Sequence, residues 1–187
     1  MKVLALDVAG TPRRWVTNQE AISYHAKKAV VWGLGDIVAT YHGGFQKNET
    51  QSVIETPCII AVRGPGFDIS RFGKVGLSNT TLFGRDRYMC AYCGLVFKTS
   101  QGLSRDHIVP KALGGRDTWM NVVASCKHCN TKKGHKTLKE AKMELLYVPY
   151  VPNHFEDLIL RGRGGMVQDQ MDYLIAGVPK HSRVLLN

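Results

Sequence analysis

An Asp and a His stand side by side in the segment SRDHIVPKALGG, residues 104–115, and their types suggest chemistry. A histidine can act as a general base near neutral pH, and a carboxylate can bind a hard metal cation. Adjacent Asp and His are nevertheless common in proteins. In isolation, Asp106 and His107 are equally well explained as a polar surface pair, so their interpretation depends on the rest of the chain.

Four of the five cysteines form two C-x2-C pairs that bracket this dipeptide. They are Cys90, Cys93, Cys126 and Cys129. Four thiolates at such spacing can complete a tetrahedral shell around zinc, although a chance grouping of reduced thiols is the alternative. His128 could compete for the metal, but the C-x2-C spacing favours the cysteine. A closed four-Cys shell has no open position, so the sequence predicts a structural zinc.

Two asparagines lie within the same frame. Asn121 comes 14 residues after His107, and Asn130 comes 9 residues later, directly after Cys129. Because zinc would fix the first turn of the helix that carries Asn130, we expect this side chain to be a well-positioned oxygen ligand. A carboxylate oxygen of Asp106 and an amide oxygen of Asn130, with water completing the shell, suit Mg²⁺ or Mn²⁺.

The charge balance favours a polyanionic partner. The chain of 187 residues has a formal net charge of +10, and nucleic acid is the first candidate for such a balance. Residues 81–147 hold 12 Lys and Arg against 5 Asp and Glu, so most of the excess lies around the motifs. A solvated basic surface would give the same excess, and charge alone leaves both interpretations open.

The apolar runs indicate a cytoplasmic protein with no membrane partner. None approaches the roughly 20 residues that a membrane span needs. The start, MKVLALDVAG, has one Lys and a short apolar run, which indicates a strand and not a signal peptide. Cysteines in such a compartment argue against a disulfide framework. We expect Cys58, in the run TPCIIAV, to be a buried small hydrophobe.

Local patterns predict the elements that position these residues. KVLALD, DIVATYH, SVIET and CIIAVRG are typical of strands, and VAGTPR of a turn. Helices are predicted over TNQEAISYHAKKAV, TLKEAKMELLY, NHFEDLIL and MVQDQMDYLIAG. Thr17 with Glu20, and Thr137 with Glu140, have the spacing of a capping box, and Asn153 can cap the third helix.

Two features near the carboxyl end have more than one interpretation. The segment RGRGG is predicted to be a flexible linker, with phosphate contact as the alternative. The apolar face of the last helix predicts packing in a core or in a homodimer. That face comprises Met166, Val167, Met171, Leu174 and Ile175.

The run RDHIVPKALGGRDTWMNVVASCKHCNTKKG resembles the ββα-metal motif of the HNH endonuclease family, in the version supported by a four-Cys zinc. The spacing of His107, Asn121 and Asn130 is similar to that in the HNH nuclease domain of CRISPR effector proteins. The wider frame, from VLALD through LFGRDRYMCAYCG to EAKMELLYVPYVP, resembles small free-standing bacterial and phage HNH proteins. The resemblance is specific in the motif, weaker over residues 1–80, and ends near residue 152.

This resemblance implies an α+β protein with a ββα-metal nuclease core held by a four-Cys zinc site. The expected segments are an N-terminal α+β region (1–80), the nuclease domain (81–147) and a C-terminal helical extension (148–187). In the family the first His is the general base, so His107 would deprotonate the attacking water. Asp106 and Asn130 would hold one Mg²⁺ or Mn²⁺, which would stabilise the developing charge and the leaving 3′ oxygen. Asn121 would brace the loop and orient His107.

The expected function is metal-dependent hydrolysis of DNA, by nicking or by cutting both strands. Basic residues that could contact phosphate are Arg105, Arg116, Lys132 and Lys133, and each could instead be a solvated or ion-paired charge. One alternative is a non-catalytic zinc adaptor that binds DNA or RNA, which leaves the Asp–His–Asn spacing unexplained. Another is a nuclease for RNA or for branched or damaged DNA.

Two details depart from the simplest form of the family pattern. The last motif position is often His, and here it is Asn130, which affects the expected metal preference more than activity. Successive strand residues also point to opposite faces, yet Asp106 and His107 must serve one site. We therefore expect a bulge or a strand end at this dipeptide.

Overall fold

The computed structural model describes residues 1–45, 47, 49–64, 75–180 and 182–184 of an α+β chain. The chain divides into two compact units. We call Met1–Lys74 with Arg161–Val178 the sheet unit, and Val75–Leu160 with Pro179–Asn187 the cysteine unit. These limits differ from the predicted segments 1–80, 81–147 and 148–187, because the carboxyl-terminal elements are distributed between both units.

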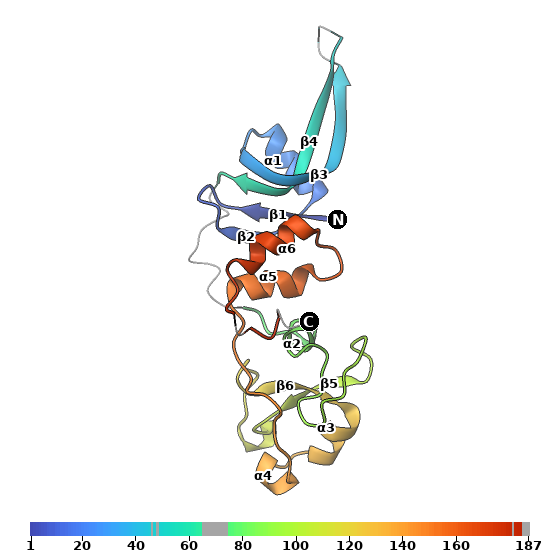
Figure 1. Ribbon diagram of the computed structural model, residues 1–187, viewed down its shortest axis with the longest axis vertical. Helices are drawn as coiled ribbons and strands as arrows, with labels where there is room; N and C mark the ends of the chain where they lie inside the picture. Colours follow the sequence, from blue (N-terminus) through green and yellow to red (C-terminus); the bar gives the residue numbers. More distant parts are fainter. Residues whose placement is uncertain (46, 48, 65–74, 181, 185–187) are drawn as a thin grey trace. The chain divides into compact units, whose positions relative to one another are not determined.

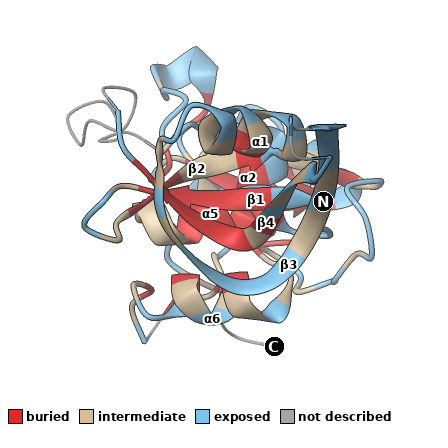
Figure 2. Cartoon of the chain, turned by 90° about the horizontal axis from the view of Figure 1, so that it is seen from above, coloured by how far each residue is buried: buried red, intermediate tan, exposed pale blue. Residues whose placement is uncertain are grey.

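The sheet unit is built on four strands in the order β2-β1-β4-β3. They are β1 (Lys2–Leu6), β2 (Pro12–Thr17), β3 (Val30–Phe45) and β4 (Gln51–Val62). β1 is parallel to β4, and the other two neighbouring pairs are antiparallel. The β3–β4 hairpin extends beyond the other strands of its sheet (Figure 1). Burial is concentrated in β1 and the end of β4, whereas much of β3 is exposed (Figure 2).

Two predictions for this sheet need correction. SVIET and CIIAV form one strand, β4, which runs through Pro57. The pairing with β3 shifts register beside the Ile37–Pro57 pair, and such an irregularity accommodates a residue that has no N–H to donate. The predicted turn VAGTPR also ends early, because β2 already begins at Pro12. The strand predicted over KVLALD is confirmed as β1.

Two helices of the sheet unit are confirmed but are shorter than predicted: the helix predicted over TNQEAISYHAKKAV ends at Ala26, and Val30 of that run already belongs to β3. α1 (Asn18–Ala26) begins at the predicted capping box, in which the Glu20 N–H donates to Thr17 Oγ1 over 3.2 Å. α6 (Gln168–Ile175) buries Leu174 of its predicted apolar face.

The buried side of α6 is fixed by hydrogen bonds to its own unit. Gln170 Nε2 donates to the carbonyls of Lys2 and Cys58, so this helix packs within the sheet unit. Ile175, predicted to belong to the packed face, is 39% exposed at the end of the helix. Cys58 is buried, as expected from its apolar run.

The cysteine unit contains the ββα arrangement. Strands β5 (Leu103–His107) and β6 (Val122–Cys126) pair antiparallel, and α3 (Lys127–Lys133) follows β6 directly. α2 (Asn79–Arg85) packs on the same pair of strands. The core of this unit comprises Leu82, Phe83, Leu103, Trp119, Val122 and Ala124. A two-stranded sheet is marginal alone, so this packing and the cysteine cluster must hold it.

A buried ion pair ties the long loops of this unit to β6. Arg85 is fully buried, pairs with Asp86, and donates to the carbonyls of Trp119, Val122 and Tyr150. The Asp86 carboxylate also accepts the N–H of Ala124 over 2.7 Å. A buried charge is tolerated only where it is paired and hydrogen-bonded, as both are here.

The helices after α3 are partly as predicted. α4 covers only Leu138–Ala141, shorter than the predicted TLKEAKMELLY, because Lys142 adopts a left-handed φ of 50° that ends the helix. Its capping box of Thr137 and Glu140 is confirmed. α5 (His154–Gly162) begins where the Glu156 N–H donates to the side-chain oxygen of Asn153, the predicted cap. Within the described ranges, no helix combines the length and apolar character that a membrane crossing needs.

Candidate metal and catalytic site

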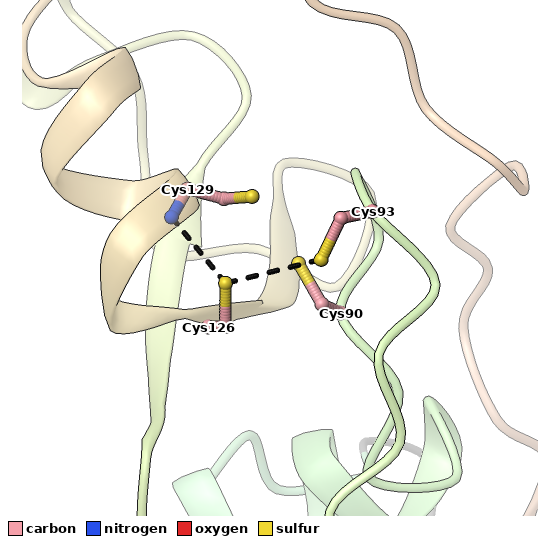
Figure 3. Close-up of side chains that lie close together, drawn as sticks. All are labelled: Cys90, Cys93, Cys126 and Cys129. Atoms are coloured by element: carbon pink, nitrogen blue, oxygen red, sulfur yellow. Dashed lines mark hydrogen bonds between the residues drawn. The ribbon is translucent and has the colours of Figure 1, made fainter.

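The four predicted zinc ligands converge at one point of the cysteine unit (Figure 3). Their sulfur atoms all lie within 4.8 Å of one another, and the Sγ atoms of Cys93 and Cys126 are 3.9 Å apart. Zinc–sulfur bonds of about 2.3 Å in a tetrahedron place the sulfurs roughly 3.8 Å apart. The cluster therefore has the dimensions of a zinc site.

Local structure explains why these cysteines meet. Cys90 and Cys93 lie on a turn that Gly94 closes with a φ of 75°, a conformation favoured by glycine. Cys126 caps α3 and accepts the N–H of Cys129 over 3.3 Å. The turn is tied to β6 by a backbone bond from Ala91 to Ala124. A metal here would join the turn, β6 and α3.

One of these thiols is already prepared to lose its proton. Burial raises the pKa of Cys90, but hydrogen bonds with the backbone of Cys126, Cys93 and Tyr92 lower it to about 7. Zinc binds the thiolate form of cysteine. The backbone around Cys90 therefore favours its thiolate, whereas the pKa values of Cys93 and Cys129 are raised, that of Cys129 mainly by burial.

The dipeptide that prompted the catalytic hypothesis lies at the end of β5. Asp106 and His107 pair with Val123 and Val122 in regular register, and the strand ends at His107. Of the two expected irregularities, the structure has the strand end. The two side chains have separate partners: Asp106 contacts Tyr92 and Lys133, while His107 contacts Asp117.

Asp106 is buried and held by two donors. Its Oδ1 accepts a hydrogen bond from Lys133 Nζ over 3.1 Å, and its Oδ2 accepts one from the Tyr92 hydroxyl. Lys133 Nζ also donates to the His107 carbonyl over 2.6 Å. Burial, with the hydrogen bond to Asp106, raises the pKa of Tyr92, so this hydroxyl keeps its proton at neutral pH. Lys133, predicted as a phosphate contact, is fully buried in this network.

Asn130 lies one turn before Lys133 on α3, at a spacing that places both on one face of the helix. Its Nδ2 donates to Ser104 Oγ over 2.8 Å, and Ser104 is two residues before Asp106 on β5. This amide orientation leaves the oxygen for another role. Asp106 and Asn130 thus both belong to the contact between β5 and α3.

The donor types at this contact, a carboxylate and an amide, are ones that suit a hard divalent cation. A carboxylate offers about four lone-pair sites, and the bonds to Asp106 use two of them. The amide oxygen of Asn130 adds a neutral donor. Among the described residues, the cysteines form the one cluster of three or more His, Cys, Asp or Glu that could hold a metal. A cation here would thus rest on two protein oxygens, with water or phosphate as the remaining ligands, as is common for Mg²⁺.

His107 has a partner that the sequence did not reveal. Its Nε2 lies 2.8 Å from Oδ1 of Asp117. The same carboxylate binds Lys111 Nζ over 2.9 Å and Arg105 over 3.1 Å. Hydrogen bonds from Lys111, His107 and Arg105 hold the pKa of Asp117 well below its usual range. An ionised carboxylate only accepts, so Nε2 of a neutral His107 carries the proton and Nδ1 is the basic nitrogen.

Asn121 closes the loop between β5 and β6. Its Oδ1 accepts the Val109 N–H over 2.9 Å, and its Nδ2 donates to the carbonyls of Val109 and Arg116. Gly115 lies so close that an added Cβ would be 1.7 Å from the Val109 carbonyl oxygen. The Asn121 side chain therefore contacts the loop backbone. It donates to the carbonyl of Arg116, and the next residue, Asp117, contacts His107.

The remaining basic residues divide into exposed and ion-paired side chains. Arg116 and Lys132 are exposed. Arg105 is 22% exposed, and besides Asp117 it binds the Asn79 side chain over 2.9 Å. Of the four predicted phosphate contacts, Arg116 and Lys132 therefore present their charge most openly to solvent.

Comparison with known proteins confirms the resemblance seen in the sequence. Residues 90–146 match the model of a family described as HNH endonuclease. That range contains the four cysteines, Asp106, His107, Asn121 and Asn130. A stretch of 54 residues is 44% identical to the CRISPR-associated endonuclease Cas9 of Corynebacterium diphtheriae, and it covers 27% of this chain and 5% of that protein. The chain thus matches only a small part of that relative.

Proposed function

We propose that this protein, whose residues 90–146 match the HNH endonuclease family, is a metal-dependent endonuclease that hydrolyses DNA phosphodiester bonds. Two contacts at the end of β5 carry the proposal. His107, the last residue of the strand, pairs with Asp117, and Asp106, the residue before it, contacts Lys133 on the helix that carries Asn130. A base and a pair of hard oxygen donors are thus supplied by one short segment and one helix.

In the proposed mechanism His107 is the general base. Its Nδ1 takes a proton from the water that attacks the phosphorus, and Asp117 stabilises the imidazolium that forms. Asp117 remains ionised during this step because three cationic or hydrogen-bonding neighbours hold its pKa low. Asn121 acts on the same base indirectly, since it fixes the loop that carries Asp117.

Asp106 and Asn130 would hold the catalytic Mg²⁺ or Mn²⁺. When bound, such an ion stabilises the developing charge on the phosphate and the leaving 3′ oxygen. Tyr92 and Lys133 fix the orientation of the Asp106 carboxylate, and Lys133 links it to the backbone of His107. The expected products carry 5′-phosphate and 3′-hydroxyl ends.

The zinc held by the four cysteines has a structural role in this proposal. Held by these cysteines, it would join α3, which carries Asn130, to the strand pair that carries Asp106 and His107. Reduced thiols are required, which favours a reducing compartment such as the cytoplasm. One chain supplies the whole residue set, so the chemistry needs no second copy.

The net charge of +10 supports DNA as the partner. We propose Arg116 and Lys132 as contacts to the phosphate backbone, because both are exposed in the unit that carries the site. Arg105 is proposed to act through Asp117, with which it forms an ion pair.

The test is cleavage of supercoiled plasmid in Mg²⁺ or Mn²⁺ by the wild type and by His107→Ala. Loss of a general base lowers the rate about 10²- to 10⁴-fold, so the variant should leave the plasmid supercoiled. If wild type cleaves no form of DNA in any divalent metal, yet binds it in a salt-dependent way, the zinc adaptor becomes the better account.

A further inference from the structure

A pocket of about 240 Å³ lies in the sheet unit, outside the nuclease machinery. Its lining consists of Met1, Lys2, Trp15, Arg161, Gly162, Arg163, Gly164 and Gly165. Three of these residues are cationic and none is acidic, so the pocket attracts an anion. The segment RGRGG, for which the sequence allowed either a flexible linker or a phosphate contact, forms most of this lining.

The glycines bring this segment against the Trp15 ring. A Cβ added at Gly162 would lie 2.5 Å from Cζ2 of Trp15, so no larger residue fits without displacement. Gly164 has a left-handed φ of 83°, which other residues rarely adopt. An added Cβ at Gly164 would meet nothing within 4 Å, so the backbone there is open to a ligand.

The size and chemistry of the pocket indicate part of a larger ligand. Pockets that enclose a whole small molecule usually measure about 300–1,000 Å³, and this one is smaller. Arginine recognises phosphate through its planar fork of donors, and tryptophan offers a face on which a base can stack. A combination of basic side chains with an aromatic ring is typical of sites that grip single strands.

We infer that this pocket binds one nucleotide of single-stranded DNA, with its base against Trp15 and its phosphate against Arg161, Arg163 and Lys2. A base inside a duplex is stacked on its neighbours, so only an unpaired base is available to the ring. The choice of DNA rests on the proposed function, whereas the nucleotide chemistry rests on the pocket. The sheet unit would then bind a strand independently of the catalytic residues.

The test is binding of a fluorescently labelled 12-nucleotide oligo(dT) to the full chain with its zinc and the His107→Ala change, followed by anisotropy. Arg161→Ala with Arg163→Ala should weaken binding at least tenfold at low salt. It should also reduce the slope of log K against log salt by about 1.4, since each phosphate contact in a single strand contributes about 0.7. Trp15→Leu should weaken binding roughly tenfold, and Trp15→Phe should weaken it less because phenylalanine still offers an aromatic ring for stacking.

The matched control is Lys27→Ala with Lys47→Ala, which removes two exposed cations of the same unit outside the pocket. If this control reduces binding and salt slope as much as the arginine pair does, the attraction is diffuse and the inference is overturned. Unchanged binding in Trp15→Leu, with its circular dichroism intact, also overturns it.

This outcome is separable from that of the proposed function. If the wild type cleaves plasmid but the pocket variants bind the oligonucleotide as well as the wild type does, the nucleotide pocket is rejected and the nuclease is kept. Pocket-dependent binding by a protein that never cleaves DNA would keep the inference and remove the nuclease.

Discussion

The two neighbouring residues at the end of β5 occupy different environments. Asp106 and its partner Lys133 have side chains that are 5% and 0% exposed. Across from His107, the side chains of Asp117 and Lys111 are 43% and 63% exposed. One environment is a buried hydrogen-bonded pair, and the other is an exposed charge cluster beside the proposed base, whose own side chain is 16% exposed.

This difference suggests separate roles: the buried Asp106 side positions the site, and the more exposed His107 side reacts. A buried ion pair is strongly destabilised when one partner is removed, because the other charge stays uncompensated. An exposed cluster contributes little to stability, yet it can hold a histidine tautomer and remain open to water and DNA. We therefore expect the Asp106 side to control folding and metal position, and the His107 side to control rate.

Removal of zinc should have the largest effect, since the metal would support both sides. Structural zinc contributes about 10–16 kcal/mol of apparent binding free energy in small peptides. Chelation, or Cys126→Ala, should therefore unfold the cysteine unit and abolish cleavage. Metal analysis and circular dichroism measure the two consequences.

The matched control for the zinc ligands is Cys58→Ala, which changes the cysteine of the sheet unit. Cys58 is not among the four clustered cysteines, and burial raises the pKa of its thiol to about 11. This variant should keep one zinc per chain. Equal zinc content in Cys126→Ala and wild type would contradict the four-Cys site.

Lys133→Met tests the buried side. It leaves the Asp106 carboxylate buried beside an uncharged side chain and should lower the free energy of unfolding by about 3–5 kcal/mol. Adding Asp106→Asn should recover part of that loss because the unpaired charge is gone. Urea unfolding of zinc-loaded protein measures both changes.

Lys132→Met is the control for this substitution, since the neighbouring side chain is exposed. It should alter stability by no more than about 0.5 kcal/mol. Similar losses in both variants would show that Lys133 does not hold a buried charge.

Asp117→Asn tests the exposed side and should have a smaller effect on stability than Lys133→Met, about 1 kcal/mol or less. It should still slow cleavage about 10- to 100-fold, because the partner that holds the His107 tautomer is weakened. Glu144→Gln, which removes another exposed acidic charge of the same unit, should cleave at the wild-type rate.

The pH dependence of this stability difference has a defined sign. The folded-state pKa of Asp117 is lowered, so its contribution is present above the unfolded-state value near 3.9 and is lost as pH falls further. The gap between wild type and Asp117→Asn should thus persist at pH 5 and shrink below about pH 4. A gap that grew on acidification would contradict the assignment of the ionised carboxylate.

Local spacing predicted the parts of the site that depend on local structure. The C-x2-C pairs, the helix that carries Asn130 and the capping boxes are all set by residues a few positions apart, and the structure has each of them. The motif spacing likewise indicated the family. α4 was predicted too long because a left-handed Lys142 is not signalled by its residue type.

The partners of Asp106 and His107 were beyond such reasoning. Tyr92 and Lys133 approach Asp106 from a turn and a helix that lie 14 and 27 residues away along the chain. Lysine is usually a surface residue, and Lys133 is buried because α3 packs on β5. One weak indication of Asp117 was present in the sequence: it is an acidic residue among several cations in the loop after His107.

The central claim is that His107 and Asp106 act together on one phosphate although their surroundings differ. The most direct measurement compares plasmid cleavage by the wild type, His107→Ala and Asp106→Ala, with zinc content and circular dichroism checked for each. We predict Mg²⁺- or Mn²⁺-dependent cleavage by the wild type and at least a hundredfold loss in both zinc-loaded variants. Wild-type cleavage rates in either folded variant would contradict the account.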